Sequence, residues 1–212
     1  MHIKRLSSSR IWPITRKGTK YVVVPTHEKE RGIPLLIVMR DILKIVRNRK
    51  EMKKILVERK VLVNDSIVRN EKMALVLLDT ISIPSINKNY RITLSKNGKI
   101  DIEEINDSES KKKIVKITSK KILKGGKIQL NMSDGRNLIS DKKVNIGDSL
   151  LIGFKAKNIE EIMPIKEKAK VLVIKGKHLG KSGNLTGIGK EVTISYEGKD
   201  LKVKNEDVMI IK

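Results

Sequence analysis

The chain has 212 residues, of which 47 are Lys or Arg and 24 are Asp or Glu, so its formal net charge is +23. An excess of this size favours a polyanion as the partner. There is no cysteine, which excludes disulfides and thiolate zinc sites, and the three histidines, His2, His27 and His178, are too scattered to suggest metal-ligand spacing. We expect no metal, no cofactor and no small-molecule substrate.

Hydrophobic residues make up 39% of the chain and aromatic residues only 2%, which predicts small aliphatic cores. The longest apolar run, residues 33–39, contains a proline and is too short to span a bilayer, and the N-terminus lacks a signal-peptide pattern. These features predict a cytoplasmic protein with no membrane contact.

The positive charge is spread along the chain and is not concentrated in one tail. A net excess of five to seven basic residues occurs in each of the segments 1–34, 35–85, 86–165 and 166–212. This distribution favours contact with a polyanion along most of the chain over a localisation signal or a merely solvated surface.

Residues 1–34 have the composition of a basic extended arm. Prolines at 13, 25 and 34 interrupt the pattern, so we expect neither a helix nor a packed sheet here. Such a segment orders on binding. We expect RNA contacts from Lys4, Arg5 and Arg10, whereas Trp12 either stacks on a base or fills a cleft against the next domain.

Two helices are predicted in residues 35–60. In the first, over 35–47, Arg40, Lys44 and Arg47 share one face because of their spacing. Asn48 is the expected N-cap of the second helix, with Glu51 in a capping box. Met52, Ile55 and Leu56 form its buried side. The basic residues of both helices are predicted RNA contacts: Arg40, Lys44, Arg47, Arg49, Lys50, Lys53 and Lys54.

Short strands follow the helices. A hairpin is predicted over 61–68 with its turn at Asn64-Asp65-Ser66, and a further strand region over 75–83. Two helices followed by short strands, with a basic helical face, resemble the S-four RNA-binding domain. That family usually has Gly-Asp before the last strand, where this chain has Leu78-Asp79, and often has Asn-Gly in the hairpin turn.

Residues 86–165 predict a compact β-domain. Its turn signals are Asn97-Gly98, Gly125-Gly126 and Asp134-Gly135. The expected strands are 90–94, 99–102, 114–118, 127–131, 137–139 and 150–154. Residues 160–168 are expected to connect this domain to the last one.

Residues 166–212 contain the stretch AKVLVIKGKHLGKSGNLTGI at 169–188, in which an apolar strand leads into a loop rich in glycine and lysine. Gly176, Gly180 and Gly183 are expected to form its tight turns. The stretch is similar to the KOW module, found in ribosomal proteins and transcription elongation factors. The resemblance implies a small SH3-like barrel, closed by strands at 191–196, 200–203 and 208–211, with RNA contacts from Lys175, Lys177, His178 and Lys181.

Two other functions are weighed against a structural role. An RNA-modifying enzyme lacks room for a catalytic domain, and the β-domain shows no clustered acid, base and nucleophile. The segment 176–182, GKHLGKS, has three residues between its glycines where a phosphate loop needs four. A free RNA-binding regulator or chaperone is compatible with the lysine-rich loop, but the long basic arm favours permanent burial in RNA.

The order of these parts closely resembles the archaeal and eukaryotic "e"-type small-subunit ribosomal proteins of family four, with the shorter archaeal members nearest in length. The resemblance implies an α+β chain with four parts: an arm (1–34), a small helical-hairpin/β RNA-binding domain (35–85), a β-barrel-like central domain (86–165) and a C-terminal SH3-like KOW barrel (166–212). It further implies a non-enzymatic structural protein whose partners are small-subunit ribosomal RNA and neighbouring ribosomal proteins.

Overall fold

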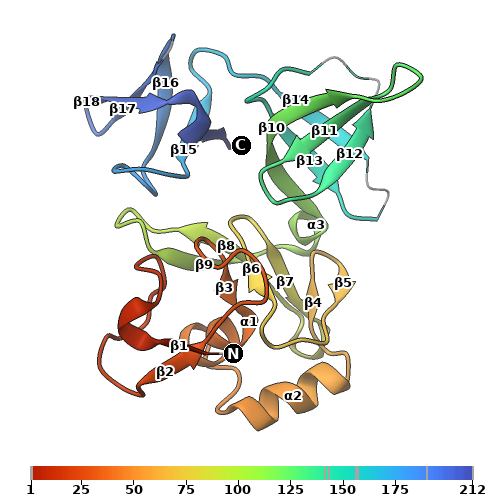
Figure 1. Cartoon of the computed structure of the whole chain (residues 1–212), viewed down its shortest axis with the longest axis vertical. Coiled ribbons are helices and arrows are strands. Elements are labelled where there is room, and N and C mark those ends of the chain that lie inside the picture. Colours follow the sequence, from red (N-terminus) through yellow and green to blue (C-terminus); the bar gives the residue numbers. More distant parts are fainter. Residues whose placement is uncertain (1, 141, 143, 156–157, 190, 212) are drawn as a thin grey trace. The chain divides into compact units, whose positions relative to one another are not determined.

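The computed structural model describes residues 2–140, 142, 144–155, 158–189 and 191–211. The chain forms two compact units, one made of Met1–Ser95 with Lys99–Lys111, and the other of Lys96–Gly98 with Lys112–Lys212. Most of the secondary structure is antiparallel β-sheet, and α2 is the only described α-helix longer than four residues (Figure 1).

The first unit contains all the described α-helices and three sheets. Its five-stranded sheet has the order β5-β4-β7-β8-β9, and two small sheets pair β1 with β2 and β3 with β6. The elements are β1 (His2–Lys4), η1 (Arg5–Ser7), β2 (Tyr21–Val23), β3 (Ile33–Pro34), α1 (Leu35–Ile37), η2 (Val38–Ile42), α2 (Arg49–Val57), β4 (Leu62–Val63), β5 (Ser66–Ile67), β6 (Ala74–Leu75), β7 (Thr80–Ile83), η3 (Pro84–Ile86), β8 (Lys88–Leu94), β9 (Ile100–Ile105) and α3 (Asp107–Ser110).

The second unit is built from two five-stranded antiparallel sheets. The central sheet has the order β12-β11-β10-β13-β14, and the C-terminal sheet has the order β18-β17-β16-β15-β19. The strands are β10 (Lys112–Ile122), β11 (Ile128–Met132), β12 (Asn137–Ser140), β13 (Ser149–Gly153), β14 (Ile159–Met163), β15 (Lys170–Val173), β16 (Ser182–Ile188), β17 (Glu191–Tyr196), β18 (Lys199–Lys204) and β19 (Val208–Ile210), with the 3-10 turn η4 (Asn205–Asp207) before β19.

Residues 1–34 are packed into the first unit, so the prediction of an arm without a packed sheet is wrong. β1 pairs with β2, and the Trp12 side chain is only 3% exposed in the unit's core. The Trp12 indole donates a hydrogen bond to the carbonyl of Gly32 at 3.0 Å. The backbone of Ile11 also accepts the amide of Ile100 at 2.8 Å. The segment contains few apolar residues, but they are enough to hold it against the unit because a buried tryptophan removes a large apolar area from water.

The predicted helix over 35–47 is also wrong in its second half. Helical structure ends with η2 at Ile42, a π-helical turn, and Lys44 has the left-handed φ of +54°. A left-handed residue is a common way to end a helix, usually at glycine. Arg40, Lys44 and Arg47 therefore do not share one regular helical face.

The second helix and the hairpin are confirmed. Asn48 caps α2 by accepting the amide of Glu51 at 3.0 Å, and Met52 and Leu56 are buried. In the hairpin turn, Asn64 and Asp65 have φ values of +49° and +60°, the backbone of a tight two-residue turn. The left-handed φ of +63° at Leu78 explains why a glycine suits this position in the resembling domain.

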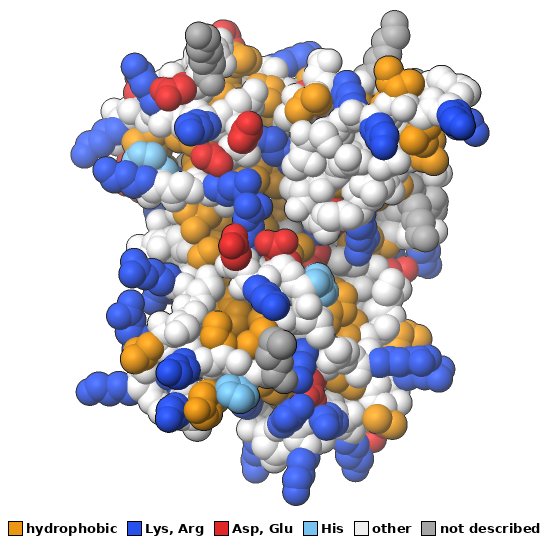
Figure 2. Space-filling view, viewed as in Figure 1, with side chains coloured by type: hydrophobic (Ala, Val, Ile, Leu, Met, Phe, Trp, Pro, Cys, Tyr) orange, Lys and Arg blue, Asp and Glu red, His pale blue; other side chains and the backbone are white. Residues whose placement is uncertain are grey.

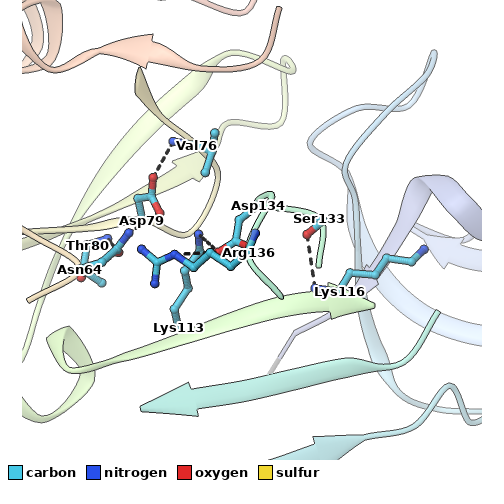
Figure 3. A network of polar contacts seen from close by, with 9 residues as sticks. All are labelled: Asn64, Val76, Asp79, Thr80, Lys113, Lys116, Ser133, Asp134 and Arg136. Carbon is cyan, nitrogen blue, oxygen red and sulfur yellow. Dashed lines mark hydrogen bonds and ion pairs between the residues drawn. The ribbon is translucent and has the colours of Figure 1, made fainter. Parts of the chain in front are cut away.

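Side-chain hydrogen bonds hold the hairpin turn at Asn64-Asp65 in place. Asn64 donates to the Asp79 carboxylate at 2.8 Å and accepts the amide of Thr80 at 3.1 Å, and Asp79 also accepts the amide of Val76 at 2.7 Å (Figure 3). Asn64, Asp79 and Thr80 are buried, so their hydrogen bonds offset the cost of removing polar atoms from water.

Two further expectations are corrected. β8 and β9 pair with β7 in the first unit, although the sequence placed residues 86–111 with the central β-domain. Residues 160–168 were expected to be a connection, yet most of β14 lies there and pairs with β13. The other predicted strands of the second unit are present, and β16 is an additional strand that was not predicted.

Candidate nucleic-acid interface

A basic groove lies along the first turns of α2 and the segment that precedes it. It is lined by Lys44, Ile45, Arg47, Asn48, Lys50, Glu51 and Lys54. The groove brings together four of the predicted RNA-contacting residues, which we call the groove cations: Lys44, Arg47, Lys50 and Lys54. None of them forms an ion pair with another residue in the described part of the chain.

The one acidic residue of the groove has a local role. The Glu51 carboxylate accepts the backbone amide of Arg47 at 2.8 Å, while the Glu51 amide donates to Asn48. These bonds cap the N-terminus of α2, whose first residues line the groove, and the helix dipole adds a partial positive charge there. Four cations and one carboxylate leave an excess of positive charge that suits a phosphate backbone.

The remaining predicted residues of this region do not line the groove. Arg40 forms a two-bond ion pair with Asp41, at 2.8 Å for each bond, and this hydrogen-bonded partner raises the pKa of the guanidinium. Lys53 is exposed on α2 outside the groove. Figure 2 shows Lys and Arg side chains over much of the visible face, with a group at its lower end, where α2 lies in Figure 1.

Arg49 has a structural role within the protein. Its guanidinium donates to the carboxylate of Glu71, with 2.6 Å between Nε and Oε1, and also forms an ion pair with it through Nη2. Glu71 is buried, being 5% exposed, whereas the Arg49 side chain is 52% exposed. The second carboxylate oxygen of Glu71 is buried without a hydrogen bond from the described residues. Arg49 therefore neutralises a buried charge.

We expect the substitution Arg49→Met to lower the free energy of unfolding by about 2 kcal/mol, because it leaves the buried carboxylate without its charged donor. On a Glu71→Gln background the same substitution should cost much less. Denaturant titration measures both values. Lys50→Met is the matched control, since Lys50 is exposed on the same helix and should change stability by less than about 0.5 kcal/mol. Equal costs on the two backgrounds would contradict the pairing.

The predicted arm residues differ in how far they are engaged. Lys4 and Arg10 are exposed. Arg5 donates to the carbonyls of Thr15 and Thr19 and to the Thr19 hydroxyl, at 2.8 to 2.9 Å, and so holds the turn that leads to β2. The sequence could not show this, because the partners lie ten and fourteen residues away.

The second basic site is the loop of residues 174–181 between β15 and β16. Gly176 and Gly180 have φ values of +84° and +85°, as expected for glycines at turns. The loop is closed where the Gly180 amide donates to Val173 and the Val173 amide donates to Lys181, both at 2.9 Å. The loop contains all four predicted residues, Lys175, Lys177, His178 and Lys181. Lys177 is exposed, and the other three are half-buried.

Gly183 has a different reason for being glycine. It lies in β16, and a Cβ atom there would be 2.1 Å from the carbonyl oxygen of Ser195. The expectation of a turn at this position is wrong; the requirement is close approach of two backbones. Tyr196 was missed by sequence reasoning: the Lys181 ammonium lies 5.1 Å from the centre of its ring, a cation–π distance set by strand pairing.

A buried lysine lies beside this loop. Lys116 of β10 is 4% exposed, and its ammonium donates to the carbonyls of Asn205 at 2.5 Å and Val208 at 2.6 Å. Burial lowers the pKa of Lys116 to about 8 from its usual 10.5, and the charge of Lys175 acts in the same direction, against the opposing effects of Asp207 and Glu206.

This shift predicts a pH dependence of stability. Between about pH 8 and 10.5 the unfolded chain keeps a proton on Lys116 that the folded chain has released, so the free energy of unfolding rises with pH in this window. Relative to Lys116→Met, the gain should approach about 3 kcal/mol at the upper end. Denaturant titrations of both proteins at several pH values measure it, and a difference that is constant with pH would contradict it.

No three His, Cys, Asp or Glu side chains among the described residues are placed to hold a metal ion. Within the same residues, no helix has the length and apolar character needed to cross a membrane. The fold combines sheets with small cores, a basic groove and a basic glycine-rich loop, and these basic features are typical of a nucleic-acid-binding protein.

Comparison with known proteins agrees with this class. The model of ribosomal family S4e matches residues 86–159. The small ribosomal subunit protein eS4 of Methanocella arvoryzae is 40% identical over 88% of this chain and 80% of its own length, and that of Methanocaldococcus jannaschii is 31% identical over 99% and 93%. The crystal structure of 30S ribosomal protein S4e from Thermoplasma acidophilum superimposes with a TM-score of 0.72 at 27% identity, covering 86% of this chain and 96% of that one. The chain belongs to the S4e family of small-subunit ribosomal proteins.

This result confirms the prediction, made from the order of the sequence segments, of an "e"-type small-subunit ribosomal protein of family four. It also confirms the prediction of a structural, non-enzymatic protein over that of an RNA-modifying enzyme.

Proposed function

We propose that the protein is a structural constituent of the cytoplasmic small ribosomal subunit that binds and positions ribosomal RNA. The observation that carries the proposal is the likeness over nearly the full chain to proteins named as small-subunit components. Its partners would be small-subunit ribosomal RNA and neighbouring ribosomal proteins.

The mechanism is electrostatic and steric. The groove cations and the loop of residues 174–181 neutralise phosphates and release condensed counterions. Contacts from lysine and arginine to phosphates recognise RNA shape and backbone more than base sequence. Lys4, Arg10 and Lys53, which are exposed outside both sites, add to the general attraction, whereas Arg5, Arg40 and Arg49 are engaged within the protein.

The finer division of the chain is part of this proposal. The helices and first strands correspond to an S-four RNA-binding domain, the central sheet to a barrel-like domain, and the C-terminal sheet to an SH3-like KOW barrel. The confirmed cap of α2, the tight turn at Asn64-Asp65 and the glycine-rich loop support these assignments. The packed segment of residues 1–34 joins the first of these domains.

Sedimentation tests the assignment. A lysate of the source organism is separated on gradients at low and high salt, and the protein is traced with an antibody. A structural component sediments with small subunits in about equal amount to other subunit proteins and stays with them at high salt. A free RNA-binding regulator, the alternative function, would move to the top of the gradient as the salt is raised.

A further inference from the structure

The last strand of the C-terminal sheet has an edge that no strand of this sheet covers. β19 pairs with β15 on one side only, through Val208↔Val173, Met209↔Leu172 and Ile210↔Val171. The backbone groups on its other side need partners, because β19 is buried over its whole length.

Two side chains of the central sheet supply these partners. Lys116 on β10 and Ser149 on β13 lie directly opposite each other in the strand register. The Lys116 ammonium donates to the carbonyl of Val208, and the Ser149 hydroxyl accepts the amide of Ile210 at 3.0 Å. Both side chains are buried. A donor and an acceptor thus take the place of a neighbouring strand at successive outward-facing residues of β19.

The contact extends from this edge to the basic loop. Lys116 also donates to the carbonyl of Asn205, the first residue of η4. The last residue of η4, Asp207, accepts through its carbonyl the amide of Ile174 at 2.7 Å. Ile174 is the first residue of the loop that carries Lys175, Lys177, His178 and Lys181. Figure 3 shows the Lys116 side chain extending away from the neighbouring Lys113 and Asp134.

We propose that Lys116 is a positioning residue for RNA binding: by completing the open edge of β19 and holding η4, it fixes the base of the loop of residues 174–181 without touching RNA itself. Ser149 assists at Ile210. The inference rests on the proposed function for the loop's role, but its structural part stands on the contacts above. Lys116 thus has a role that the charge pattern of the sequence does not show, since that pattern cannot distinguish Lys116 from surface lysines.

Amide hydrogen exchange tests the structural part. Lys116→Met removes the ammonium and keeps an unbranched apolar side chain, and Lys121→Met, an exposed lysine on the same strand, is the control. We expect exchange at Ile174 and Ile210 to become at least about tenfold faster in Lys116→Met, because Lys116 no longer holds η4, which carries the acceptor of the Ile174 amide, or β19, which contains Ile210. Exchange in β17 should change less than about twofold, and the control should match the unmodified protein. Unchanged exchange at Ile174 would overturn the proposal.

Salt dependence tests the link to RNA, with purified small-subunit ribosomal RNA as the probe. Lys177→Met removes a proposed phosphate contact and should reduce the slope of log affinity against log salt by about 0.7 to 0.9. Lys116→Met should lower the affinity about fivefold or more while the slope stays the same. A slope loss equal to that of Lys177→Met would mean that Lys116 contacts phosphate, and would overturn the proposal.

A milder variant covers the case in which Lys116→Met does not fold. Ser149→Ala removes only the acceptor of the Ile210 amide, so faster exchange at Ile210 within a folded protein is expected, and its absence would contradict the role of the edge. Failure of the proposed function has a different signature, which is that the unmodified protein itself shows no salt-dependent binding to the RNA.

Discussion

Charge reversal in the basic groove should weaken RNA binding by roughly 100- to 1000-fold at about 0.1 M salt. In the triple variant Arg47→Glu, Lys50→Glu, Lys54→Glu, three phosphate contacts are lost, which lowers the slope of log affinity against log salt by about 2 to 3. If the two proteins bind equally at about 1 M salt, a slope difference of this size gives the expected loss of affinity when the salt is lowered tenfold to about 0.1 M. Filter binding to small-subunit ribosomal RNA over a salt series measures both quantities.

The fold should tolerate this change. Met52 and Leu56, which bury the other side of α2, are untouched, and Lys50→Glu places a negative charge in the first turn of a helix, where it is favourable. A circular dichroism spectrum and a melting curve like those of the unmodified protein are therefore expected.

A matched triple variant controls for net charge alone. Lys60→Glu, Lys88→Glu and Lys112→Glu remove the same charge from lysines that are already paired with Glu58, Glu104 and Glu160. Exposed ion pairs contribute little to stability, so this variant should fold as well. Its loss of affinity should be at least tenfold smaller. Equal losses in the two variants would mean that RNA responds to overall charge, and the groove would not be a site.

The substitution Gly183→Ala should destabilise the second unit by at least about 4 kcal/mol. The new Cβ would lie 2.1 Å from the Ser195 carbonyl oxygen and 2.9 Å from a methyl group of Ile194. The closest atom belongs to the backbone of the paired strand β17, so β16 and β17 must move apart and lose ladder hydrogen bonds. Losses of this size are reserved for such strain and for large core defects.

Gly187→Ala is the matched control, because Gly187 lies on the same strand with its nearest atom 3.7 Å from an added Cβ. It should change the free energy of unfolding by less than about 1 kcal/mol. Denaturant titration of the two variants decides the matter. Similar values for both would show that β16 can shift without cost, contrary to the geometry.

The features that could be predicted from the sequence are local ones. The cap of α2 by Asn48 and the turn at Asn64-Asp65 depend on neighbouring residues alone, and both are present. Four cations of the groove could be predicted for the same reason, since they lie within eleven consecutive residues, 44–54.

What could not be predicted depends on partners far along the chain. Arg49 is indistinguishable from its neighbour Lys50 until Glu71 is placed beside it, and Lys116 resembles any other lysine until η4 lies against it. The strands β8 and β9 have a pattern that fits either unit, so only the pairing with β7 assigns them. Trp12 was given two possible roles, and burial in the core selects one.

The hydrogen bond from the Ile100 amide to the Ile11 carbonyl has a consequence for how the first unit folds. It joins residues separated by most of that unit's sequence, and a connection of this span costs entropy before any contact rewards it. The tight turn at Asn64-Asp65 and α2 can form early, because their contacts are short-range. The segment around Trp12 also contacts β9 through this bond. We therefore expect the beginning of the chain to be one of the last parts of this unit to reach its final structure.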